Sequence, residues 1–231
     1  MFHWPDSAAG RLLRKLERHY GRIAPPACGG PFEMILREIV AYLADDARRD
    51  AAFVALRDRA GLTPAQILSA GHAQLCEITR LGGPIAAEER AGRLETAARL
   101  VQDEFGGDLS AILQLPAPKG KKLLMRFPMI GEPGAEKILL FCGAHAVLAL
   151  ESNGLRVLVR AGIAEEDRNY AATYKAMREA TLEQLPSDIP LLTAAHLLLR
   201  RHGQELCFRT GPACGACPVN TDCRHFMADG G

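Results

Sequence analysis

The stretch Cys207-Phe-Arg-Thr-Gly-Pro-Ala-Cys214-Gly-Ala-Cys217-Pro-Val-Asn-Thr-Asp-Cys223 holds four of the seven cysteines of this 231-residue chain. The gaps between the four cysteines are six, two and five residues. Thiolates are soft ligands, and four of them on one short loop can surround a single metal centre. The spacing therefore predicts that this loop binds a metal centre.

Three interpretations of the loop compete. Disulfides are typical of secreted chains, and the start Met1-Phe-His-Trp-Pro-Asp does not resemble a signal peptide. Structural zinc usually takes two close cysteine pairs, whereas only Cys214 and Cys217 are close here, with a single cysteine on either side. An iron–sulfur cluster held by four thiolates fits this spacing best, and zinc is the next alternative.

The composition is that of a globular, helix-rich protein, with 48% hydrophobic and 6% aromatic residues. A net charge of +1 gives no global basic field, so any nucleic-acid binding must come from a local patch. No apolar run reaches the length of a membrane span. We interpret the scattered Cys28, Cys76 and Cys142 as buried small hydrophobic residues. These features favour a chain in the reducing cytoplasm.

Helical periodicity without strand alternation predicts an all-α fold. A first helix is expected after Asp6 or Ser7, either of which can cap it, and another after Thr63-Pro64. The further expected helices lie at about 31–40, 49–59, 75–79, 88–105, 170–185 and 191–202. A glycine-bearing turn within 127–141 is expected to join two helices. Such a turn presents backbone N–H groups at a helix start, where phosphate oxygens can bind.

The spacing Cys-x6-Cys-x2-Cys-x5-Cys resembles the [4Fe–4S] loop of the endonuclease III family of helix-hairpin-helix DNA glycosylases. The likeness extends from about Pro31 to Cys223. It implies two helical domains with a cleft between them: a six-helix barrel at 31–145 that ends in the hairpin, and a cluster domain of 1–30 plus 146–231. It also implies double-stranded DNA as the partner of a monomer, and four cluster ligands: Cys207, Cys214, Cys217 and Cys223.

The hairpin departs from the family pattern. The stretch Phe127-Pro-Met-Ile-Gly-Glu-Pro-Gly-Ala135 resembles the family's Leu-Pro-Gly-Val-Gly-Arg-Lys-Thr-Ala. Met129 replaces the first glycine, in a turn that glycine tolerates better. Glu132 replaces a basic residue and would repel phosphate. Pro133 stands where bifunctional members carry the catalytic lysine, and proline has neither an amine nor a backbone N–H.

Two further positions differ from the family. Leu43 stands where the family has a glutamine that enters the DNA; leucine can still wedge between bases but cannot hydrogen-bond the orphaned base. Glu151 falls on the position of the essential aspartate, so the resemblance implies a catalytic carboxylate, whereas a carboxylate at a helix start is also favourable without any catalysis. The DNA-contacting candidates are Lys119, Lys121, Lys122, Arg126, Ile130, Gly131, Gly134 and Leu43.

Two functional hypotheses follow from these matches and departures. The first is a monofunctional base-excision glycosylase without lyase activity, which flips a nucleotide out of duplex DNA and hydrolyses its N-glycosidic bond. The second is a non-catalytic DNA-binding or redox-sensing iron–sulfur protein on a glycosylase scaffold. Leu43, Pro133 and Glu151 all fall at catalytic or base-probing positions, and this coincidence supports the second hypothesis.

Overall fold

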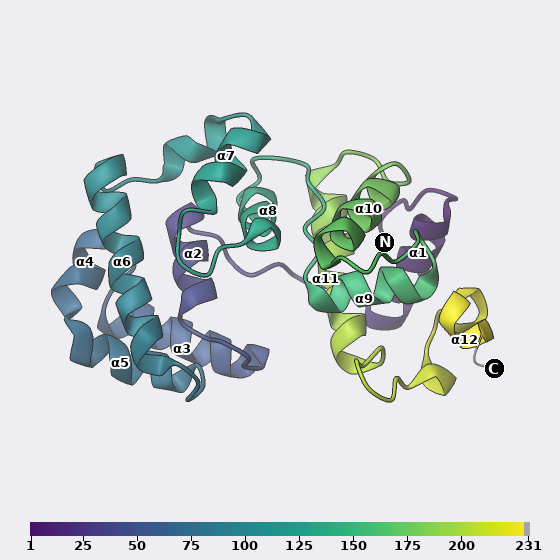
Figure 1. The fold of residues 1–231 in the computed structure, drawn as a ribbon, viewed down its shortest axis with the longest axis horizontal. Helices are drawn as coiled ribbons and strands as arrows, with labels where there is room; N and C mark the ends of the chain where they lie inside the picture. The colour runs from purple at the N-terminus through teal and green to yellow at the C-terminus, as the bar shows by residue number, and fades with distance from the viewer. Residues whose placement is uncertain (229–231) are drawn as a thin grey trace. The chain divides into compact units, whose positions relative to one another are not determined.

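The computed structural model describes residues 1–228. Within them the chain is helical and contains no β-strand (Figure 1), which confirms the predicted all-α class. No helix among these residues is long and apolar enough to cross a lipid bilayer. The chain divides into two compact units, which we call the middle unit (Ala27–Ala144) and the terminal unit (Met1–Pro26 with His145–Gly231). The domain boundaries expected from the sequence, 31–145 and 1–30 plus 146–231, stay a prediction.

The middle unit contains seven α-helices in the described chain, against the six that were expected. Gly71, whose φ of 78° lies outside the helical region, separates two short helices that the sequence also predicted as separate. The helices are α2 (Pro31–Ile39), α3 (Asp46–Arg59), α4 (Pro64–Ala70), α5 (His72–Leu81), α6 (Ala87–Phe105), α7 (Ala117–Leu124) and α8 (Glu132–Phe141), with a 3-10 turn η1 (Ser110–Gln114) between α6 and α7.

The core of the middle unit forms around α2, which packs against α6 and α8, while α6 also packs against α4 and α5. The apolar side of α2 is fully buried at Ile35, Leu36 and Ile39, as its amphipathic pattern requires. The predicted start of α4 is confirmed: Thr63 and Gln66 form a reciprocal capping box ahead of Pro64.

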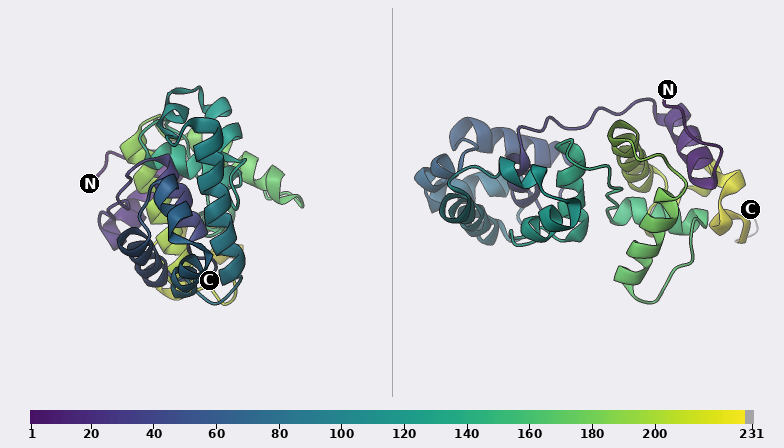
Figure 2. Two further views of the ribbon diagram at one scale, coloured as in Figure 1. Left: turned by 90° about the vertical axis from the view of Figure 1, so that its left-hand side faces the viewer. Right: turned by 90° about the horizontal axis from the view of Figure 1, so that it is seen from above.

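The terminal unit contains α1 (Ala8–Tyr20), α9 (Ser152–Ala161), α10 (Tyr170–Leu182), α11 (Ile189–Glu205) and α12 (Arg224–Ala228), with two 3-10 turns, η2 (Cys214–Ala216) and η3 (Asn220–Asp222), in the cysteine loop. Ser7 caps α1 by accepting the N–H of Gly10. The long α11 packs against α9 and α1. Figure 2 shows α1, in purple, beside the yellow C-terminal segment, where Lys15 contacts Thr221 at 3.0 Å and Asp222 at 2.8 Å.

Candidate functional site

The four loop cysteines line one small apolar pocket in the terminal unit, together with His202 and Arg160. All four side chains are half-buried. Burial raises the pKa of the Cys217 thiol, and the other three cysteines raise it further, because they are close enough for like charges to interact. The structure thus brings together the residues that the sequence predicted as cluster ligands.

Two arginines one turn apart on α9 hold the cysteine loop in place, and the sequence analysis missed this role. Arg156 donates to the carbonyl oxygens of Cys207 and Gly203 at 2.8 and 2.7 Å. Arg160 donates to the Cys207 sulfur at 3.3 Å and to the carbonyl oxygens of Phe208 and Arg209 at 2.6 and 3.1 Å. Their i, i+4 spacing puts both on one face of the helix, and this spacing is the signal that could have revealed them.

A buried histidine supports the same loop from α11. The ring of His202 lies 3.5 Å from the Cys217 sulfur through Nε2 and 3.0 Å from the Tyr20 hydroxyl through Nδ1. Burial lowers the pKa of His202 to about 4, and burial raises the pKa of Tyr20 to about 12. Both groups are therefore neutral near pH 7, and they place a polar but uncharged wall beside the sulfur.

Within residues 1–228, no group of three or more His, Cys, Asp or Glu side chains is arranged to hold a metal ion. A single zinc ion needs four sulfurs about 2.3 Å from one point. In a four-iron cluster each thiolate binds a different iron, so the sulfurs surround a larger body. The four cysteines lie around one pocket.

Glu151 lies directly before α9 and caps it. Its Oε1 accepts the N–H of Gly154 at 2.9 Å, and its Oε2 accepts the side-chain amide of Asn153 at 2.8 Å. The Asn153 side chain in turn accepts from Arg156 at 2.7 Å. Hydrogen bonds therefore connect the half-buried carboxylate of Glu151 to the arginine that holds the cysteine loop.

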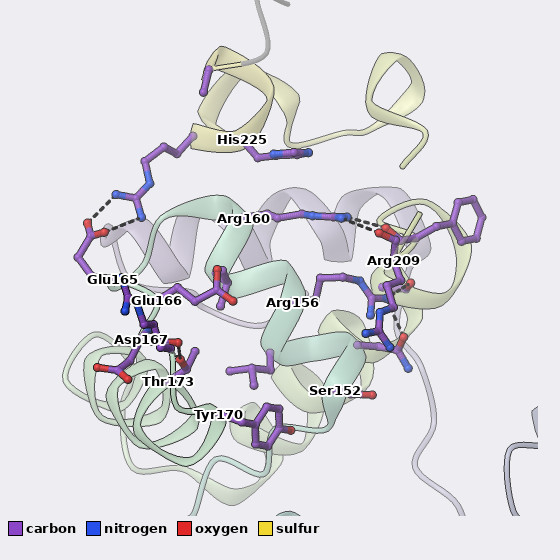
Figure 3. A pocket seen from close by; sticks show the side chains of 18 of the residues that line it. Ser152, Arg156, Arg160, Glu165, Glu166, Asp167, Tyr170, Thr173, Arg209 and His225 are labelled. Atoms are coloured by element: carbon purple, nitrogen blue, oxygen red, sulfur yellow. Dashed lines mark hydrogen bonds and ion pairs between the residues drawn. The ribbon is translucent and has the colours of Figure 1, made fainter. Parts of the chain in front are cut away.

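An open pocket of about 1370 Å³ lies beside α9 in the terminal unit (Figure 3). Its rim carries both signs of charge, since Arg224 pairs with Glu165 at 2.6 Å, and Glu166 and Asp167 lie near them. Tyr170 lines this pocket, and burial followed by the charge of Glu151 raises the pKa of the Tyr170 phenol. The pocket offers water access beside the start of α9.

The hairpin connects α7 to α8 through a left-handed residue, as predicted: Met129 has φ 64°. Such a conformation costs a non-glycine residue about 1–2 kcal/mol. Gly131 precedes α8, and Pro133 lies in its first turn. Lys137, the nearest lysine along α8, is ion-paired to Glu38 at 2.8 Å and is only 19% exposed.

The predicted DNA-contacting residues of the middle unit differ in accessibility. Lys119 and Lys122 are exposed, and Gly131 and Gly134 place backbone at the start of α8. Three further side chains of this set are engaged. Lys121 pairs with Glu132 at 2.5 Å and Glu136 at 3.2 Å, Arg126 pairs with Glu104 at 2.6 Å, and Ile130 is 4% exposed.

Leu43 is one of the most exposed apolar residues of the described chain, at 76%, and it has φ 49°. The buried Arg90 on α6, which sequence analysis missed, stabilises the loop that carries it. Arg90 donates to the carbonyl oxygens of Val40, Thr79 and Gly83. Leu43 is therefore an exposed leucine in a strained backbone conformation.

Comparisons with known proteins agree with this arrangement. No protein-family model matches the chain. The endonuclease III of Sulfolobus acidocaldarius is 24% identical over 228 residues, which cover 95% of this chain and 96% of that protein. The structure of a trapped endonuclease III–DNA covalent intermediate superposes with a TM-score of 0.76 at 17% identity, covering 95% of each chain. The chain is endonuclease III-like.

Two further comparisons support the endonuclease III-like fold. A thermostable thymine-DNA glycosylase superposes with a TM-score of 0.76 at 17% identity, covering 96% of this chain and 97% of that one. The plant DNA glycosylase/AP lyase ROS1 of Arabidopsis thaliana is 27% identical over 141 residues, which are 56% of this chain but only 10% of that protein. The predicted resemblance and helix-hairpin-helix glycosylase fold are thus confirmed.

Proposed function

We propose that this endonuclease III-like chain binds double-stranded DNA and releases a base by hydrolysis, without lyase activity. The observation that carries the proposal is a pair of features at two helix starts. A carboxylate, Glu151, is fixed at the start of α9, while the start of α8 has Pro133 in place of an amine. These two positions bear on function because the chain is similar to endonuclease III along nearly its whole length.

The proposed reaction needs a negative charge beside the sugar. When the bond between C1′ and the base nitrogen breaks, positive charge builds up on the deoxyribose ring, and a nearby carboxylate stabilises it. The base leaves with the bonding electrons, a water oxygen then bonds to C1′, and the proton that the water loses ends on the released base. Glu151 would supply that charge and orient the water, and its bonds to Gly154 and Asn153 fix its direction.

The absence of lyase activity rests on the hairpin. Strand cleavage by β-elimination requires an amine that attacks C1′ and forms a Schiff base. Pro133 has none, and the amine of Lys137 is ion-paired to Glu38.

We also propose that Cys207, Cys214, Cys217 and Cys223 hold a [4Fe–4S] cluster. Their shared apolar pocket and the Arg160 N–H directed at the Cys207 sulfur support this assignment. When bound, the cluster would cross-link a loop that has only short 3-10 turns of its own. This chain's own residues, Arg156, Arg160 and His202, then set the position of that loop against α9 and α11.

One observation favours the alternative, a non-catalytic DNA-binding protein. Both oxygens of the Glu151 carboxylate already accept hydrogen bonds from within the chain, as a purely structural helix cap would. The two functions differ in whether a base is released.

The deciding experiment incubates the purified protein with a panel of duplexes, each carrying one damaged or mismatched base, and measures free base by mass spectrometry. Release of any base, lost in Glu151→Gln, supports the glycosylase. Binding without release from any duplex supports the alternative.

A further inference from the structure

Two cysteines outside the loop lie in direct contact. The sulfur of Cys28 is 2.9 Å from the sulfur of Cys142, although 114 residues separate them in the sequence. A disulfide bond is about 2.05 Å long, so the two sulfurs need to approach by about 1 Å to bond. The sequence suggested that both were isolated buried residues; the structure corrects this, because both are half-buried and paired.

The pair occupies a distinctive place in the chain. Cys28 lies in the segment before α2, one residue after the chain enters the middle unit at Ala27. Cys142 directly follows α8, two residues before the chain leaves that unit at Ala144. A bond between them would therefore tie together the two ends of the middle unit and would close a loop that contains all of its helices.

The surroundings give the two thiols different roles. The hydrogen bond from Cys142 lowers the pKa of Cys28 to about 7, against the opposing effects of burial and the charge of Glu33. The same contact and burial raise the pKa of Cys142. Thiolates are the nucleophiles in disulfide exchange, so the lowered pKa of Cys28 and the raised pKa of Cys142 favour Cys28 as the attacking sulfur.

We propose that Cys28 and Cys142 are a reversible dithiol–disulfide site that reacts with a low-molecular-weight disulfide such as oxidised glutathione. In the first step the Cys28 thiolate attacks one glutathione sulfur, forms a mixed disulfide and releases a glutathione thiolate. In the second step Cys142 attacks the Cys28 sulfur, releases the second glutathione and passes its proton to solvent. Two protein thiols are oxidised and one glutathione disulfide is reduced, so the electrons balance.

Cys76 provides a matched comparison within the same unit. It is buried on α5, and no contact with a second sulfur is described for it. A reaction that depends on the pairing of two thiols should therefore spare Cys76, whereas non-specific oxidation of an unfolded chain should not.

The test uses the full chain, purified without air and equilibrated with glutathione at a series of oxidised-to-reduced ratios. The sample is quenched with acid, alkylated and digested with trypsin. Cys28 falls in the tryptic peptide 23–37 and Cys142 in the peptide 138–156, while Cys76 and the loop cysteines fall in other peptides. Mass spectrometry then counts each linked pair separately.

We expect the linked peptide 23–37/138–156 to rise from under a tenth to over nine-tenths of the protein across the series, with a two-electron dependence. Cys142→Ser should stop the reaction at a glutathione adduct on Cys28, and Cys28→Ser should react roughly tenfold more slowly at Cys142. Cys76→Ser should behave as the unmodified protein.

Two outcomes overturn the proposal. One is the absence of the linked peptide at every ratio while both thiols remain open to alkylation. The other is linkage of Cys76 to either cysteine at a similar level, because that result indicates scrambling of an unfolded chain. Far-ultraviolet circular dichroism of each variant establishes that the helices are retained.

Discussion

At the residue scale, Glu151 combines two tasks that one substitution can separate. The Glu151→Gln change keeps an oxygen that can accept the Gly154 N–H but removes the negative charge. We expect base release to fall by at least about a hundredfold, since an electrostatic contribution of this kind is worth several kcal/mol. The melting temperature should change by less than about 2 °C, because the helix cap is kept. Single-turnover release and thermal unfolding measure the two effects.

Asp188 is the matched control for that substitution. It caps α11 in the same unit by accepting the N–H of Leu191 at 2.8 Å. Asp188→Asn also replaces a capping carboxylate by its amide, and it should leave base release unchanged. Base release that survives in Glu151→Gln would show that another carboxylate acts.

At the element scale, the start of α8 carries the proposed absence of lyase chemistry. We expect no borohydride-trapped complex with abasic-site DNA, because Pro133 has no amine and Lys137 is paired with Glu38. Gel electrophoresis after borohydride treatment measures the trapped fraction. Pro133→Lys restores an amine at this position and is the positive control. A trapped complex in the unmodified protein that disappears in Lys137→Ala would make the enzyme bifunctional.

The loop that carries Leu43 begins at a carbonyl that is bound by a buried side chain of α6. Arg90 has no exposed surface and donates to the backbone carbonyl of Val40, where this loop begins, and to those of Thr79 and Gly83 at and after the end of α5. Arg90→Met should lower the free energy of unfolding by about 3 kcal/mol, since buried carbonyl oxygens lose their donors. Arg99→Met on the same helix is the control, because Arg99 is 60% exposed, and it should change stability by less than about 0.5 kcal/mol. Chemical denaturation measures both.

Local signals explain which elements could be predicted. The Thr63-Pro64 helix start and the strained turn at Met129 depend on a few neighbouring residues, so both could be predicted from the sequence. The roles of Arg90, Arg156 and Arg160 depend on carbonyl oxygens that only the tertiary fold brings near. The contact between Cys28 and Cys142 spans nearly the whole middle unit, so no local pattern indicated it.

At the scale of the whole molecule, the proposed DNA binding of a chain with net charge +1 depends on a few exposed cations. Lys119 and Lys122 are exposed, whereas Lys121 is held by Glu132 and Glu136. Changing Lys119 and Lys122 together to Ala should lower the slope of log affinity against log salt by about two. Lys121→Ala should change that slope by less than one and should instead destabilise the hairpin, because Glu136 is 2% exposed. Fluorescence anisotropy across a salt series measures the slopes.

The cysteine loop links the proposed cofactor to the proposed chemistry. Protein purified without air should contain about four irons and four inorganic sulfides per chain, since four thiolates hold a cubane. Cys214→Ser should lower both the iron content and the soluble yield, because a loop of short turns loses its cross-link.

Arg156 connects this loop to the Asn153 amide that contacts Glu151. Base release should therefore fall in Cys214→Ser even in the soluble fraction. Stoichiometric zinc without iron would overturn the cluster assignment, and base release that is unchanged per folded molecule would remove the link between loop and carboxylate.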